Sequence, residues 1–166
     1  MYLLDSSVLI SANNKYYPVD RVPEFWEWLI HQGKQSVCKI PHEVIAEITA
    51  GTKTGDLLVG WMKEPANRSA LLLEEMVDPK HVNTVLLEGY GENLTDVEME
   101  VIGQDPFLIA YAMADHKNRC VVTVETSAPS RSRARRKLPD VCSGFSLQCC
   151  DPFQFYHGVG FRTSWK

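Results

Sequence analysis

Long apolar runs are missing from this sequence. No stretch approaches the roughly 18 apolar residues that a membrane-spanning helix needs, so we expect no membrane span. The N-terminus also lacks the basic start and small-residue cleavage site of a secretory signal, because Asp5 interrupts the opening apolar triplet. We therefore predict a cytoplasmic protein.

Cysteine pairs typical of zinc sites are absent as well. The five cysteines include no C-x-x-C pair, and the adjacent Cys149 and Cys150 are poorly spaced to share one zinc ion. No glycine-rich phosphate loop and no Ser-His-Asp order stands out. These absences argue against a zinc-stabilised module, a P-loop enzyme and a serine hydrolase.

The composition predicts one globular domain over residues 1–166. Of these residues 45% are hydrophobic and 23% are charged, which excludes a disordered chain and allows one core. The net charge of −4 hides an asymmetry, because residues 1–116 carry a net −10 and residues 117–166 a net +6. An acidic body with a basic end suits a protein that binds a cation and a polyanion, although a solvated surface also explains it.

Short apolar segments alternate with helical patterns along the chain. This alternation is typical of an α/β fold with a mainly parallel sheet. Gly33 and Gly51 are expected to end two helices, whereas segments 89–95 and 126–144 are expected to be loops. The expected strands cover 2–4, 36–40, 120–125 and 145–150, and the expected helices cover 6–12, 23–32, 41–50, 55–63, 79–87, 105–117 and 151–158.

Four acidic residues lie where an apolar element meets its edge. Asp5 and Glu125 follow strands, Glu47 lies inside a helix, and Asp105 begins one. Ligands bind beyond the carboxyl ends of parallel strands, and carboxylates gathered there repel one another unless a cation neutralises them. Oxygen ligands select Mg²⁺ or Mn²⁺. The structural alternatives are helix caps for the two aspartates and a surface position for Glu47.

Four segments resemble the PIN-domain family, including the VapC-like toxins of toxin–antitoxin modules. They are YLLDSSVLI, PHEVIAEI, DPFLIAYAMA and VVTVE, and the resemblance runs from residue 2 to about residue 150. It implies a three-layer α/β/α fold with a central mainly parallel sheet. It also implies Mg²⁺- or Mn²⁺-dependent endoribonuclease activity on RNA, with 5′-phosphate and 3′-hydroxyl products. A cognate antitoxin protein is the implied partner, and a homodimer stays open.

Carried over by motif, the resemblance assigns the catalytic and metal-binding roles to four acids. Asp5 and Asp105 are expected to hold the metal, and Glu47 and Glu125 to complete its shell directly or through water. Glu43 lies one helical turn before Glu47 and is an alternative helix acid.

The first and last of these motifs depart from the family pattern. The family usually has D-T-N or D-S-N at the start, whereas this chain has Ser6 and Ser7 after Asp5. The late T-x-D is replaced by Thr123-Val124-Glu125, in which the side chain of the acid is longer by a methylene group. The hydroxyls of Ser6 and Thr123 are expected to orient a carboxylate or the attacking water. Asp140 is a further candidate for the site.

A basic segment and a set of aromatic residues have two interpretations each. The basic segment contacts RNA phosphates or is a solvated loop. The aromatic residues of two helices form a surface that binds a partner or stacks on bases, or they pack in the core, and core packing is favoured. They are Phe25, Trp26 and Trp28 in one helix and Phe153, Phe155 and Tyr156 in the other. The residues predicted to bind RNA are Arg131, Arg133, Arg135, Arg136 and Lys137.

Two other functions compete with a nuclease. A catalytically degenerate PIN module would bind RNA or a protein partner without cleavage, and the changes at Ser7 and Glu125 keep this alternative open. An aspartate-nucleophile phosphatase is disfavoured, because such enzymes typically need a second aspartate at the position that Ser7 occupies.

Overall fold

Four short strands form the central sheet of the computed structural model, which describes residues 1–50 and 56–166. The strands are β1 (Tyr2–Leu4), β2 (Cys38–Lys39), β3 (Cys120–Val122) and β4 (Gln148–Cys150), and their order is β2-β1-β3-β4. Leu3 of β1 lies beside Lys39 of β2 and beside Val121 of β3. Every strand pair in the described residues is parallel, which confirms the predicted sheet.

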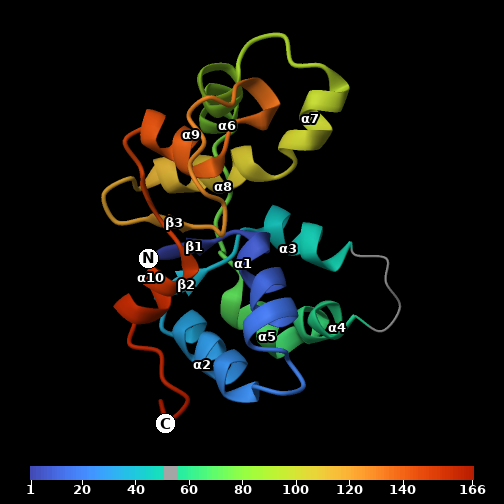
Figure 1. Cartoon of the computed structure of the whole chain (residues 1–166), viewed down its shortest axis with the longest axis vertical. Helices are drawn as coiled ribbons and strands as arrows, with labels where there is room; N and C mark the ends of the chain where they lie inside the picture. The colour runs from blue at the N-terminus through green and yellow to red at the C-terminus, as the bar shows by residue number, and fades with distance from the viewer. Residues whose placement is uncertain (51–55) are drawn as a thin grey trace.

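Helices cover both faces of this sheet (Figure 1). Helices α1, α2, α5 and α10 lie on one side, and α6, α7, α8 and α9 lie on the other. This arrangement confirms the predicted three-layer α/β/α fold. The helices are α1 (Ser6–Ser11), α2 (Pro23–Lys34), α3 (His42–Thr49), α4 (Leu57–Lys63), α5 (Pro65–Leu71), α6 (Pro79–Thr84), α7 (Asp96–Ile102), α8 (Asp105–Ala114), α9 (Leu138–Gly144) and α10 (Pro152–Gly158), with π-helical turns at Ala12–Tyr16 and Val85–Tyr90 and a 3₁₀ turn at Arg133–Arg135.

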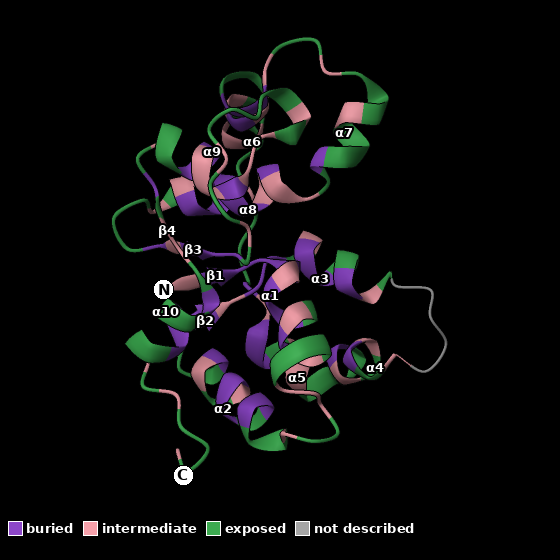
Figure 2. Cartoon of the chain, in the orientation of Figure 1, coloured by how far each residue is buried: buried purple, intermediate pink, exposed green. Residues whose placement is uncertain are grey.

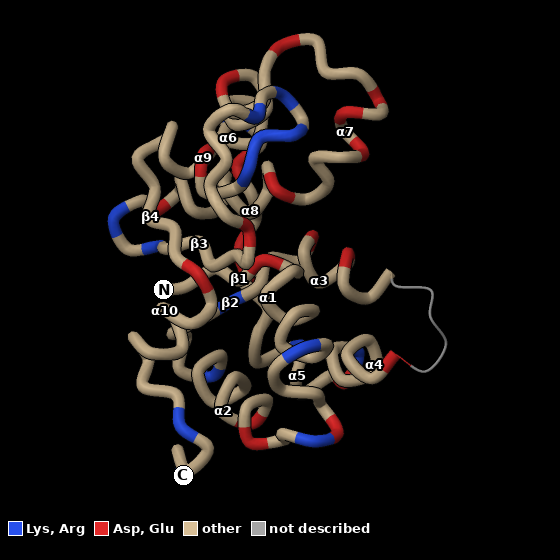
Figure 3. The backbone as a smooth tube through the Cα atoms, viewed as in Figure 1, with Lys and Arg blue, Asp and Glu red and all other residues tan. Residues whose placement is uncertain are grey.

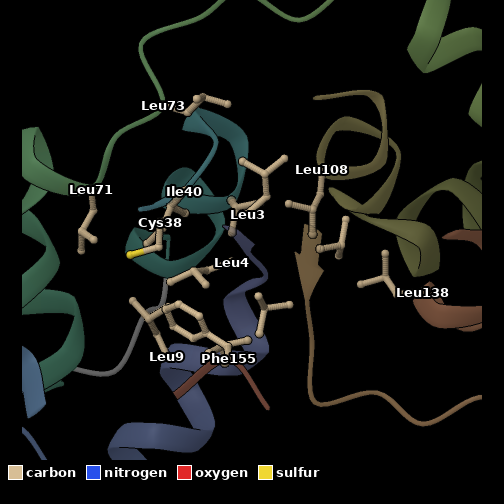
Figure 4. Close-up of a cluster of buried hydrophobic side chains, with 14 of the residues drawn as sticks. Leu3, Leu4, Leu9, Cys38, Ile40, Leu71, Leu73, Leu108, Leu138 and Phe155 are labelled. Atoms are coloured by element: carbon tan, nitrogen blue, oxygen red, sulfur yellow. The ribbon is translucent and has the colours of Figure 1, made fainter. Parts of the chain in front are cut away.

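The core lies on the two faces of the central strand β1. Successive side chains of a strand point to opposite faces, so Leu3 and Leu4 enter different layers. Neither side chain has exposed surface. Figure 4 shows Leu3 beside Leu108 of α8, and Leu4 near Leu9 of α1 and Phe155 of α10. Figure 2 shows buried positions in β1, β2 and β3 and on the inner sides of these helices, whereas no residue of the edge strand β4 is buried. Burial on both faces holds β1, and with it the residue that follows it, in a fixed position.

Segment 126–144 was expected to be a loop, and this prediction is wrong for residues 138–144. Helix α9 begins at Leu138, with Pro139 in its first turn, and it buries Leu138, Val141 and Cys142. Proline near the start of a helix is favourable because its missing N–H needs no partner there. The serine- and arginine-rich residues before α9 concealed this short apolar pattern.

The structure also corrects the expected number of helices and the end of the third strand. Helices α5 and α7 were not expected, although Thr95 and Glu98 form a capping box at the start of α7. Strand β3 ends at Val122, so Glu125 lies three residues beyond it. The predicted helix-ending Gly51 and the start of the helix predicted from Gly55 lie outside the described residues.

Gly33 does not end its helix as expected, because α2 continues to Lys34. A Cβ atom at this position would lie 2.7 Å from the carbonyl oxygen of Ala70. The missing side chain therefore allows close packing between α2 and α5.

No helix among the described residues is long and apolar enough to cross a membrane.

Candidate functional site

Asp5 is the buried centre of the candidate site. It follows β1, and its backbone N–H donates to the carbonyl of Val122 at 3.0 Å, which places it at the carboxyl edge of the sheet between β1 and β3. Its side chain is 7% exposed, so most of its stabilisation must come from protein groups. Oδ2 accepts hydrogen bonds from the hydroxyls of Ser7 and, at 2.9 Å, of Thr123, while the Ser6 hydroxyl lies 3.4 Å from Oδ1.

The pKa of Asp5 is raised from its ordinary value despite these hydrogen bonds. Burial is the largest cause, and the charge of Glu125 adds to it, while the hydroxyls of Ser7 and Thr123 oppose the rise. Thr123 was expected to orient a carboxylate, and its hydroxyl contacts the Asp5 carboxylate. Ser7 departs from the family pattern, but its hydroxyl also donates to Asp5.

The carboxyl group of Asp105 has a strongly raised pKa. It begins α8, and burial together with repulsion from Asp5, Glu125 and Glu47 raises its pKa to about 8. The buried hydroxyl of Tyr90 donates to Oδ2 at 3.3 Å and partly opposes this rise. Tyr90 was not predicted, because the sequence around it indicated only a loop.

Glu47 belongs to the same cluster, whereas Glu43 does not. Burial raises the pKa of Glu47, the charge of Asp5 adds to the rise, and the hydroxyl of Ser6 opposes it. Solvent still reaches the Glu47 side chain. Glu43 instead lies beside Tyr111 of α8, whose pKa it raises, so the structure favours Glu47 as the helix acid.

Glu125 lies near the cluster but contacts the start of α9. Oε1 is 2.6 Å from Nζ of Lys137, and Oε2 accepts the backbone N–H of Leu138 at 2.8 Å. Both oxygens are therefore engaged by groups that stabilise a carboxylate. Glu125 raises the pKa of Asp5 and Asp105 through its charge, and its own contacts anchor the start of α9.

Asp140 does not join the acidic cluster. It accepts hydrogen bonds from the hydroxyl of Ser127 at 2.5 Å and from the N–H of Ala128 at 2.8 Å, and these bonds lower its pKa. Asp140 thus fixes the loop that joins β3 to α9.

In the basic segment, some side chains make hydrogen bonds or ion pairs within the protein, and others extend into solvent. Arg133 forms an ion pair with Glu98 at 2.5 Å, which lowers the pKa of Glu98 to about 2. Arg136 donates to the carbonyl oxygens of Gly89 and Asp140, and Lys137 is paired with Glu125. In the described part of the chain, the exposed side chains of Arg131 and Arg135 make no hydrogen bond or ion pair, so they remain available for phosphates.

The donor chemistry of the cluster fits a hydrated Mg²⁺ or Mn²⁺ ion. Figure 3 shows acidic positions gathered where α8, β1 and α1 meet. Within residues 1–50 and 56–166, no three side chains of His, Cys, Asp or Glu are close enough together to hold an ion directly between them. Mg²⁺ usually keeps several waters and needs only one or two carboxylates. Asp5 and Asp105 are suited to direct contact, and Glu47 is suited to contact through water.

The chain was compared with protein families and with curated proteins. None of the curated proteins matches it. Residues 2–163, almost the whole chain, match a family that is described as Domain of unknown function (DUF4411). The chain therefore belongs to the DUF4411 family.

Proposed function

We propose that this chain is a metal-dependent endoribonuclease of the PIN type and the toxin of a toxin–antitoxin module. The observation that carries the proposal is the convergence of Asp5, Glu47 and Asp105, from three different elements, at the carboxyl edge of a parallel sheet. Their mutual repulsion destabilises the ionised state, and a divalent cation would relieve that repulsion.

The residues of the cluster have distinct roles in this proposal. Asp5 and Asp105 would hold the ion, which when bound activates a water and neutralises phosphate charge. The hydroxyls of Ser7 and Thr123 keep the Asp5 carboxylate in one orientation. Tyr90 positions Asp105 in the same way. Glu125 holds α9 and its preceding basic segment beside the site.

The test is cleavage of RNA by the purified protein with Mg²⁺, with Mn²⁺ and with EDTA. We expect cleavage only with a divalent ion, products with 5′-phosphate ends, and a loss of at least about 100-fold in Asp5→Asn. Asp115→Asn is the matched control, because Asp115 lies just beyond the far end of α8 and should leave cleavage unchanged. Equal cleavage by the wild type and Asp5→Asn would refute the assignment.

A catalytically degenerate PIN module is the second candidate function. It is favoured by one observation, namely that both carboxylate oxygens of Glu125 are already engaged by Lys137 and Leu138. Such a module would bind RNA or a protein without cutting. A thermal melt with and without Mn²⁺ separates the two candidates, because the nuclease should gain stability from the ion and a degenerate module should gain little.

The toxin role requires a partner that restrains the nuclease. We infer an antitoxin protein with a segment that covers the acidic site and presents a basic side chain to it. A neighbouring gene for a small DNA-binding protein would support this role. Co-expression with that protein should relieve growth inhibition, and unrelieved inhibition would argue against the pairing.

A further inference from the structure

A cavity of about 250 Å³ lies between α1 and α10. Val8 of α1, Val124 after β3 and Pro152 of α10 provide apolar lining, and Lys15 contributes a cation. Drug-sized ligands typically occupy larger pockets of roughly 300–1,000 Å³. The cavity is therefore suited to a small planar group rather than to an extended molecule.

This cavity continues the edge that carries the acids. Val124 stands between Thr123 and Glu125, and Val8 follows the serines that contact Asp5. Pro152 comes shortly after the end of β4, the strand next to β3. A strand of nucleic acid whose phosphate lay at the acids could therefore reach the cavity along the same edge of the sheet.

Two exposed aromatic rings, Tyr16 and Phe153, form part of the cavity wall. Their side chains are 50% and 51% exposed, and their ring centroids lie 5.1 Å apart in an edge-to-face arrangement. The neighbouring Phe155 and Tyr156 are buried, so the favoured core role holds for them and not for Phe153. An edge-to-face pair leaves a ring face open to a third ring.

The charges around the aromatic pair suit a phosphate backbone. Lys15 is exposed, and in the described residues its side chain makes no ion pair. Asp151 also lines the cavity, but its Oδ1 accepts the N–H groups of Phe153 and Gln154 at 2.8 and 2.9 Å. The carboxylate thus caps α10 and fixes Phe153, while Lys15 remains available for a phosphate.

We propose that this cavity binds unpaired bases of single-stranded RNA, which stack on Tyr16 and Phe153 while Lys15 contacts a neighbouring phosphate. The proposal rests on the proposed nuclease function for the position of the cleaved bond. Stacking on aromatic rings is tolerant of sequence, because every base has a flat face. The cavity therefore selects unpaired RNA over duplex RNA and does not read a sequence.

The experiment measures binding of single-stranded RNA by fluorescence anisotropy in EDTA, so that cleavage is not needed. We expect Phe153→Ala and Tyr16→Ala to raise Kd about 5- to 100-fold. Phe153→Leu keeps an apolar side chain but loses the ring, and it should weaken binding similarly. Leu57→Ala removes an apolar side chain of similar exposure, 52% against 51%, from α4 and should leave Kd unchanged.

A series of RNAs with one abasic residue at each position tests stacking itself. When the abasic residue occupies the stacked position, the wild type should bind this RNA more weakly than the intact RNA. Phe153→Ala should bind the abasic and the intact RNA with the same Kd, because it has already lost the stacking contact. Duplex RNA should be insensitive to the variants. An equal effect of Phe153→Ala on every abasic RNA and on the duplex, or no effect on any of them, would overturn the proposal.

The failure of this proposal is distinguishable from the failure of the nuclease proposal. Cleavage that continues with an unchanged KM in Phe153→Ala would overturn stacking and leave the nuclease intact. Base-dependent binding by a protein that never cleaves RNA would support stacking and favour the degenerate module.

Discussion

Replacing Asp105 by asparagine should stabilise the metal-free protein, and the gain should grow with pH. The pKa of Asp105 is about 8 in the folded chain, against about 4 for an unfolded aspartate. The folded protein therefore retains the proton more tightly, so its stability is greatest below the unfolded pKa and falls as pH rises toward 8. Asparagine keeps the shape of the protonated acid and carries no charge at any pH.

The expected gain in the free energy of unfolding follows from the difference between the folded and unfolded pKa values of Asp105. Each pKa unit corresponds to about 1.4 kcal/mol, and part of the strain is shared with Asp5 and Glu47, whose pKa values are also raised. We therefore expect the advantage of Asp105→Asn in the free energy of unfolding to increase by about 2 to 3 kcal/mol between pH 5 and pH 8. Urea titrations in EDTA at these two pH values measure it.

Two controls decide what such a result means. Asp115→Asn removes a carboxylate beyond the other end of α8. The difference in the free energy of unfolding between this variant and the wild type should be the same at pH 5 and pH 8. Saturating Mn²⁺ should stabilise the wild type at pH 8 and so reduce the difference in the free energy of unfolding between the wild type and Asp105→Asn. A gap that stays constant between pH 5 and pH 8 would refute the claim that carboxylates are repelling one another at this edge.

Three further predictions concern the groups around the cluster. Thr123→Val removes the hydroxyl that donates to Asp5 at 2.9 Å; it should lower the free energy of unfolding by about 1 to 3 kcal/mol in urea titrations, and Thr123→Ser should restore it. Glu125→Gln breaks the ion pair with a lysine at 2.6 Å; it should cost about 1 kcal/mol of stability while calorimetry finds Mn²⁺ affinity unchanged, and lost affinity would make Glu125 a ligand. Arg135→Ala should reduce the slope of log Kd for RNA against log salt by about 1 without changing stability, and an unchanged slope would identify a solvated loop.

The strands and most helices could be predicted because their signals are local. Each strand lies within an apolar segment, and α8 and α10 both begin with Asp-Pro. Helix α9 could not be predicted in this way, since its apolar residues follow an arginine-rich segment and are fixed by burial against the rest of the fold. Gly33 misled for a related reason, because its lack of a side chain serves a contact with Ala70, which is distant in the sequence.

The acids of the site were predicted, but their partners were not. The end of a parallel strand and the start of a helix are visible in sequence, and these positions, together with the resemblance to the PIN-domain family, made Asp5 and Asp105 candidates. The hydroxyl of Tyr90 reaches Asp105 only after its π-helical turn packs beside α8, and no local pattern indicates that contact. The ion pair between Glu125 and Lys137 likewise depends on the position of α9.

The partners of each acid show where negative charge remains uncompensated. Asp5 has hydroxyl donors on both oxygens, and Glu125 has a lysine and a backbone N–H. Asp105 has only the hydroxyl of Tyr90 as a donor in the described residues, although three other carboxylates raise its pKa. Among the residues that the structure describes, Glu47 has only the hydroxyl of Ser6 opposing the rise of its pKa. The least compensated negative charge therefore lies on Asp105 and Glu47, and a divalent cation would gain more beside these two carboxylates than beside Glu125.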